Sequence, residues 1–375
     1  MPRKQLPAAS SVEAGITRVI RPLVLSCLVA TAAVALTPDI SAADEGGVSF
    51  WVPGFFGSLA AIPQQPGWSL ATIYYHTSVS GGAGVAFARE SEAGKIPVNL
   101  SGTLNASLTG SGNIGFIIPS YVFGTPVLGG QAAVTLVTAY GCTNASVNGT
   151  LMGILTGPNG NSIPFTRSDS IANSACGIAD LIPQTSLRWN NGVNNYLAYL
   201  TGDVPAGFYN PNSIANMGIG HSAIDAGGGY TYLNPKVGQE FSGVLGFTYN
   251  FLNPATQYQN GLDMHFDWGA SQFVTKQLLV GVVGYAYREL GCDSGVGDRV
   301  GCFQSQVFGA GPQVGFNFPV GNMQGYINLK AYKEFAARNR ADGWNAWLTF
   351  AISPEAPTVP TPHQYQGAHV ASTLR

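Results

Sequence analysis

The sequence predicts an all-β fold, a transmembrane antiparallel β-barrel of about 12 strands with about 14 as the alternative. Three observations support it: few charged residues, side-chain polarity that alternates with a period of two, and strand-like segments of roughly 10–13 residues. Only 10% of the 375 residues are charged, against about 25% in an ordinary soluble protein. The chain therefore has too few charges for a fully solvated surface. Hydrophobic residues make up 45%, which is too apolar for a disordered chain.

The alternation recurs through most of the chain. In residues 240–251, for example, Phe241 and Phe247 alternate with Ser242 and Thr248. Successive side chains of a strand point to opposite faces, so each segment has one apolar and one polar face. A soluble sandwich would hide the apolar faces between two sheets, whereas a membrane barrel turns them to lipid. The segment lengths and the aromatic residues at segment ends favour the barrel.

The predicted strands, in order, are 68–79, 98–122, 131–140, 179–189, 193–202, 223–233, 240–251, 262–273, 278–289, 304–318, 323–335 and 343–352. Residues 98–122 are ambiguous. Counted as one strand they give the 12-stranded barrel, while two strands would require another near 84–92, because single-chain bacterial barrels have an even number.

Connection lengths predict which end of the barrel faces outward. Short connections lie near 190–192, 234–239, 274–277 and 319–322. Longer ones lie at 141–178, 203–222, 252–261, 290–303 and 336–342. Short periplasmic turns and long outer loops are typical of outer-membrane barrels.

Residues 1–43 are expected to be a secretory signal. Arg18 and Arg21 precede an apolar run at 23–36, and small residues lead to a cleavage site after Ala43. The apolar run is shorter than the roughly 20 residues of a membrane-spanning helix. The sequence therefore predicts export and localisation in the bacterial outer membrane.

Three further parts of the mature chain are expected. Residues 44–66 are rich in aromatic residues, Pro and Gly and do not alternate in polarity. They are interpreted either as a small plug at the periplasmic mouth or as a partly ordered leader. The barrel is placed at 67–352, and the Pro-rich residues 353–375 are expected to form a disordered tail.

The mature chain has four cysteines, Cys142, Cys176, Cys292 and Cys302. An even count in an exported chain predicts disulfides, and the local pairing of Cys142 with Cys176 and of Cys292 with Cys302 is favoured. Both pairs would fall in long outer loops. The spacings do not fit a zinc site, so no metal and no cofactor are expected.

Charged and aromatic residues on the polar faces of strands are candidates for lining the lumen. The candidates are Asp263, His265, Asp267, Lys330, Tyr332 and Glu334. Residues i and i+2 of a strand lie on the same face, about 6.6–6.8 Å from each other. The three candidates of 263–267 therefore form one patch, and the three of 330–334 form another. The patches either set selectivity and a field across the pore or simply fill the interior with polar groups.

Enzyme chemistry is not expected, and neither is nucleic-acid binding. His76 and Ser78 are the nearest approach to a base and nucleophile pair, but this spacing is common in any alternating strand. The formal net charge of −2 provides no basic face for a nucleic acid.

Four stretches resemble a known family, the MetA-pathway of phenol degradation family of outer-membrane transporters. They are Val52-Pro53-Gly54-Phe55-Phe56-Gly57-Ser58-Leu59-Ala60-Ala61, Val127-Leu128-Gly129-Gly130, Gly309-Ala310-Gly311-Pro312-Gln313-Val314-Gly315 and Tyr332-Lys333-Glu334-Phe335-Ala336-Ala337-Arg338-Asn339-Arg340. The resemblance implies a barrel that passes small hydrophobic or aromatic compounds by passive diffusion, with outer-membrane lipid and such a compound as its partners. The alternative is a closed structural or surface-recognition barrel that binds a partner through its outer loops. Residues 141–178 are expected to be an elaboration particular to this chain.

Overall fold

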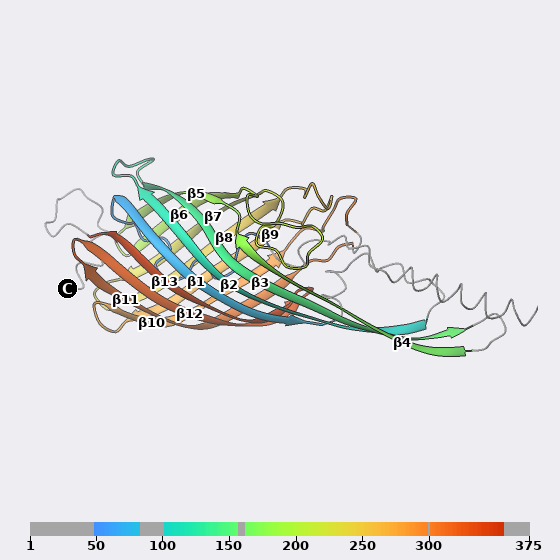
Figure 1. Cartoon of the computed structure of the whole chain (residues 1–375). Helices are drawn as coiled ribbons and strands as arrows, with labels where there is room; N and C mark the ends of the chain where they lie inside the picture. Colours follow the sequence, from blue (N-terminus) through green and yellow to red (C-terminus); the bar gives the residue numbers. More distant parts are fainter. Residues whose placement is uncertain (1–48, 83–100, 157–161, 299–300, 356–375) are drawn as a thin grey trace, which may run out of the picture.

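The structure is a computed structural model, and it describes residues 49–82, 101–156, 162–298 and 301–355 (Figure 1). The strands in these residues are β1 (Gly67–Gly81), β2 (Ser101–Val122), β3 (Gln131–Thr156), β4 (Ser162–Ile178), β5 (Ile182–Asn191), β6 (Asn194–Asp203), β7 (Ala223–Asn234), β8 (Gln239–Asn250), β9 (Asp263–Phe273), β10 (Leu278–Glu289), β11 (Gln306–Val320), β12 (Met323–Arg338) and β13 (Asp342–Pro354). No helix in the described ranges is long and apolar enough to cross a membrane.

The sheet closes on itself. Strands that follow each other in sequence pair antiparallel, with one exception among the described strands: β4 does not pair with β5. Instead β5 pairs with β3, and β4 pairs with the outer part of β3. The ring is closed by β1, which pairs with β2 on one side and β13 on the other. Within the described residues, β4 is the one strand outside the ring, so the predicted barrel of 12 strands is confirmed.

Two segments differ in how well they follow the sequence-based expectation. The ambiguous segment 98–122 contributes one strand, β2, which is why the barrel has 12 strands. The expectation that 141–178 is an outer loop is wrong: β3 continues to Thr156, and β4 returns from Ser162 to Ile178. Ser, Thr, Asn, Gly and Ala outnumber the large apolar residues in this segment, so its strands lack strong hydrophobic contrast between their two faces. Together with the outer part of β2 they project beyond the barrel (Figure 1).

Strand β8 shows how the alternation is used. Phe241, Leu245 and Phe247 are exposed, while Ser242 and Thr248, on the other face, are fully buried. A soluble sandwich would bury the apolar set instead. Polar side chains inside and apolar side chains outside are the pattern of a barrel embedded in lipid.

Short turns lie at one end of the barrel, at 192–193, 235–238, 274–277 and 321–322. Longer connections lie at the other, at 204–222, 251–262 and 290–305. We refer to these as the turn end and the loop end. The predicted long connection at 336–342 is wrong, because β12 continues to Arg338 and only residues 339–341 separate it from β13. The N-terminus of β1 lies at the turn end, because Gly67 pairs with Val122 where β2 finishes.

Both predicted disulfides are present, Cys142–Cys176 and Cys292–Cys302. The second lies in the long connection between β10 and β11, as expected. The expected location of the first is wrong, because Cys142 and Cys176 are direct partners in the β3–β4 ladder. This bridge therefore joins two strands at the base of the projection.

The expected signal at 1–43 lies outside the described residues, and so does most of the expected tail, from 356 onward. Its first residues, 353 and 354, still belong to β13.

Candidate functional site

Residues 49–66, here called the lumen segment, lie inside the barrel. Their backbone contacts inward-facing side chains from strands around the ring. Asp267 of β9 accepts hydrogen bonds from the N–H groups of Gly54 and Phe56, at 2.9 and 3.0 Å. Glu240 of β8 accepts one from Leu59, at 2.9 Å. These bonds satisfy backbone groups that would otherwise be buried without partners.

The lumen segment follows β9 through the interior. Ser58 Oγ lies 2.9 Å from Ser271 Oγ near the turn end. Further along, Gly54 bonds to Asp267, and Trp51 stacks on His265 nearer the loop end. The segment thus spans a large part of the lumen. These contacts lie deep in the barrel and are not confined to its mouth.

Gly54 is the position at which the lumen segment most clearly requires glycine. Its φ is +90°, a conformation that other residues adopt only with strain. A Cβ atom there would lie 3.1 Å from Tyr332 and 3.2 Å from Tyr285. The backbone therefore approaches the barrel wall as closely as it does because residue 54 has no side chain.

Lys330 and Tyr332 of β12 hold the opposite side of the same turn. The ammonium group of Lys330 donates to the carbonyl oxygens of Gly54 and Phe56, at 2.6 and 3.3 Å. The hydroxyl of Tyr332 lies 3.5 Å from the Gly54 oxygen. Asp267 thus accepts hydrogen bonds from the N–H groups of this turn, and Lys330 donates to its C=O groups. The turn is held between two buried side chains of opposite charge.

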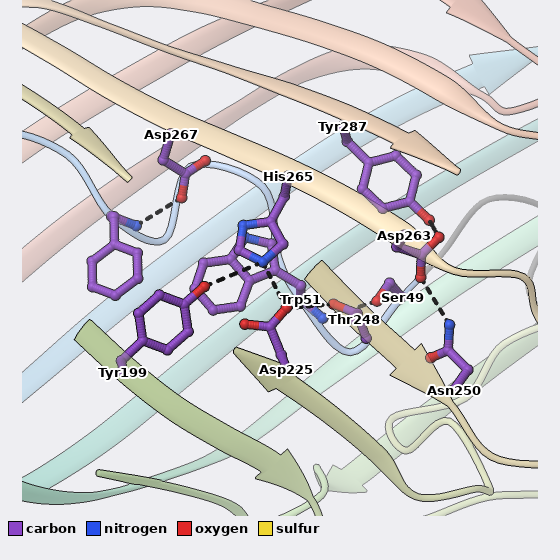
Figure 2. Close-up of polar contacts among 11 residues, drawn as sticks. Ser49, Trp51, Tyr199, Asp225, Thr248, Asn250, Asp263, His265, Asp267 and Tyr287 are labelled. Atoms are coloured by element: carbon purple, nitrogen blue, oxygen red, sulfur yellow. Dashed lines mark hydrogen bonds and ion pairs between the residues drawn. The ribbon is translucent and has the colours of Figure 1, made fainter. Parts of the chain in front are cut away.

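His265 is the centre of a second set of contacts, shown in Figure 2. Its Nε2 lies 2.8 Å from Asp225 Oδ2, and the Thr248 hydroxyl donates to the same oxygen at 2.7 Å. The indole of Trp51 covers the imidazole ring, with centroids 3.9 Å apart. Tyr199 approaches from β6, its hydroxyl 3.5 Å from Nε2. This set packs the start of the lumen segment onto β7, β8 and β9.

The remaining two candidates bond to other residues of the barrel. Asp263 accepts from Tyr287 and from Asn250, each at 2.8 Å. Glu334 accepts from the Tyr285 hydroxyl and from the Gly343 N–H, each at 2.9 Å. The structure therefore places all six predicted residues in the interior and brings His265, Asp267, Lys330 and Tyr332 against the lumen segment.

Sequence reasoning missed several partners of the lumen segment. Toward the turn end, Gln131 receives the Gln64 N–H at 2.7 Å, and Thr231 receives the Ala61 N–H at 3.0 Å. Asp225 was missed as well. The available signal for Asp225 was a lone carboxylate in a Gly-rich strand that otherwise alternates apolar and small residues.

Aromatic rings fill much of the interior around the lumen segment. Phe55 meets Phe116 and Trp347 edge-on, with centroids 6.4 and 6.3 Å apart. Phe56 lies 5.5 Å from Tyr199. The described residues contain no group of three His, Cys, Asp or Glu side chains placed to hold a metal ion. What the interior offers chemically is aromatic surface with a few buried charges that bind backbone.

A closed barrel with lipid-facing apolar side chains and a segment of its own chain in the lumen defines a transmembrane β-barrel of the outer-membrane type. The family model for the MetA-pathway of phenol degradation matches residues 88–350, and the chain belongs to this family. No curated protein matches the chain.

Three solved structures are similar in fold. An outer membrane channel from Pseudomonas putida F1 matches with a TM-score of 0.53 and 13% identity, over 80% of this chain and 99% of that one. CdiB from Acinetobacter baumannii matches with a TM-score of 0.33 and 10% identity, over 76% of this chain and 59% of that one. A FadL homologue from Pseudomonas aeruginosa matches with a TM-score of 0.32 and 10% identity, over 84% and 97%. The first similarity shows a shared fold, and the other two scores are too low to support an argument.

Proposed function

We propose that this protein is an outer-membrane channel that passes small hydrophobic or aromatic compounds by passive diffusion, and that the lumen segment is the barrier that must move. The observation that carries the proposal is the aromatic interior. Trp51, Phe55 and Phe56 of the lumen segment pack against Tyr199, Phe116 and Trp347 of the wall.

When the lumen segment shifts, the wall aromatics lose their partners and face the lumen. An apolar or aromatic compound can then replace the lost contacts and leave water without a large energetic penalty. Many weak contacts along a path allow release as well as entry. The channel reported from Pseudomonas putida has the same fold and supports this proposal.

The position of the lumen segment also supports the second candidate, a closed structural or surface-recognition barrel. The turn at Gly54 is clamped from both sides, and Ser58 is bonded to both Ser271 and Gln313. If these contacts never break, transport through the lumen is blocked and the outer loops become the working surface.

A reversible lock on the lumen segment separates the two candidates. The Oγ atoms of Ser58 and Ser271 lie 2.9 Å apart, so we expect Ser58→Cys with Ser271→Cys to form a disulfide. Uptake of labelled aromatic and alkyl compounds is measured in liposomes carrying the oxidised or the reduced double variant. Wild-type protein under the same two conditions controls for the native disulfides.

A channel with a movable lumen segment predicts uptake that falls to the level of empty liposomes on oxidation and returns on reduction. A closed barrel predicts that wild-type protein never exceeds empty liposomes. Uptake that the lock leaves unchanged would contradict the role of the lumen segment while retaining the channel.

A further inference from the structure

The outer surface at the loop end carries a hollow that the transport proposal does not use. Its volume is about 630 Å³. It lies where β1, β2, β12 and β13 meet the projecting β3–β4 hairpin. The residues that carry the argument are Ser78, Ser111, Asn144, Ser174, Lys333 and Trp344.

Strand register shows that the hollow faces away from the lumen. Trp344 pairs with Ser78, and Ser78 pairs with Ser111. The row continues through Asn144 to Ser174. Direct cross-strand partners share one face of a sheet. Trp344 is 47% exposed, whereas Asn345, on the other face, is buried, so the row points outward.

The hollow adjoins the lipid-facing surface. Tyr74 and Leu348 are cross-strand partners on the same outward face and are exposed. Ser78 follows Tyr74 by four residues along β1, a rise of about 13 Å. His76 lies between them and packs on Trp344, with centroids 4.9 Å apart. The outward face thus changes within this distance from apolar to hydroxyl and amide groups, as the membrane changes from hydrocarbon to headgroups.

The lining matches the chemistry of a sugar. Hydroxyl and amide groups both donate and accept hydrogen bonds, as sugar hydroxyls require. Two cross-strand bonds already order the lining, from Ser174 Oγ to Asn144 Oδ1 at 2.7 Å and between Thr109 and Ser146 at 2.8 Å. Trp344 adds an exposed ring on which the apolar side of a sugar can pack.

The charge of the hollow argues against phosphate as the main ligand. Among the described residues that line it, Lys333 is the one cation and Asp342 the one anion. Phosphate sites are usually built from several cationic groups, above all from arginines that bind in bidentate fashion. Balanced single charges favour a neutral, hydroxyl-rich group.

We propose that this hollow binds the saccharide part of a glycolipid in the outer leaflet. The occupant follows from two features together: the lining is that of a sugar site, and the site continues the lipid-facing surface, where a lipid holds its own headgroup. The interaction is independent of the lumen and would anchor the projection of β2, β3 and β4 on the membrane surface.

The test uses the full-length protein in lipid nanodiscs and three probes. The first is a lipopolysaccharide whose outer core consists of neutral hexoses, the second is lipid A alone, and the third is the same core oligosaccharide freed of lipid. We expect the complete glycolipid to bind at least tenfold more tightly than either fragment, since only it combines the sugar with a membrane position.

Trp344→Ala should weaken binding of the complete glycolipid at least fivefold. The matched control is Trp68→Ala, which removes another exposed tryptophan, 67% exposed, from the turn end of β1. A second variant, Ser111→Ala with Asn144→Ala, removes polar groups of the lining and should weaken binding similarly. Heat-modifiable migration on a gel shows that each variant retains the barrel.

Lipid A bound as tightly as the complete glycolipid would overturn the proposal, and so would free oligosaccharide bound equally well. Equal losses in Trp344→Ala and Trp68→Ala would also overturn it, because the effect would then belong to exposed tryptophans in general.

Discussion

The indole ring of Trp51 stacks on the imidazole of His265, with ring centroids 3.9 Å apart and planes inclined by 15°. The contact joins the first described residues of the chain to the beginning of β9, near the loop end. His265 is in turn held by Asp225 of β7. The lumen segment is therefore seated by side-chain contacts with several strands, and its position should respond to single substitutions.

Gly54→Ala should loosen the lumen segment. A Cβ at this position meets Tyr332 and Tyr285 in a backbone conformation that alanine rarely adopts, and such strain costs about 1–3 kcal/mol. We expect faster uptake of aromatic compounds by liposomes. The matched control is Gly57→Ala, whose Cβ would make an ordinary contact of 3.5 Å with Lys330. Equal uptake by the two variants would contradict the role of the turn.

Asp267→Asn should open the channel more often. The carboxylate accepts from Gly54 and Phe56 with its two oxygens, and an amide can keep only one of these bonds because its nitrogen is a donor. A buried N–H left without a partner costs about 1–3 kcal/mol. Single-channel conductance in planar bilayers should show a larger open fraction. Asp169→Asn, on the exposed outer part of β4, should leave it unchanged.

Replacing Cys142 and Cys176 by serine should affect the projection and spare the barrel. The bridge ties β3 to β4 where the two strands leave the ring, and a disulfide of this kind contributes about 2–4 kcal/mol. We expect faster hydrogen exchange in 143–175 and unchanged exchange in β7 to β10. Loss of heat-modifiable migration would show instead that closure of the barrel depends on this bridge.

Asp180→Ala should release the connection between β6 and β7. Asp180 lies between β4 and β5 and accepts from the N–H groups of Gly207 and Ile219, each at 2.7 Å. Its removal leaves both donors without this partner, at a cost of about 1–3 kcal/mol each. Hydrogen exchange at residues 207 and 219 should accelerate, while exchange in β9 should not change.

The same residue gives a pH dependence. Burial raises the pKa of Asp180 above its ordinary value of 3.8, against the opposing effect of its backbone hydrogen bonds. The folded protein therefore binds this proton more tightly than the unfolded chain does. The contribution of Asp180 to stability is lowest above the raised pKa and increases as the pH falls toward 3.8. The difference in stability between wild type and Asp180→Ala should change in this direction, and the opposite slope would contradict the assignment.

The alternating pattern predicted most of the barrel strands. A strand such as β8 has lipid on one side and a polar interior on the other, so apolar and polar side chains must alternate along it. The pattern failed in 141–178, where β3 and β4 pair outside the barrel and small or polar residues outnumber large apolar ones. Strand formation there depends on pairing, and pairing is not visible in local sequence.

The sequence identified individual residues that face the interior, but it did not identify the residues that they contact. A charged residue on an inward face, such as Asp267 or Lys330, stands out against an almost uncharged background. That both residues bind the backbone around Gly54 depends on the path of the lumen segment. Residues more than 200 positions apart come together there, and no periodicity encodes such a contact.

The ring closes where β1 meets β13, from Leu70 opposite Ile352 to Ser80 opposite Asp342. The lumen segment leads directly into β1, so the strand that completes the ring is tied to the chain that fills it. The contact between Gly54 and Lys330 spans 276 residues, and contacts this distant in sequence carry the largest loop-closure cost. During assembly, the pairing of β1 with β13 and the packing of the lumen segment therefore have to be completed together, and we expect both to form late.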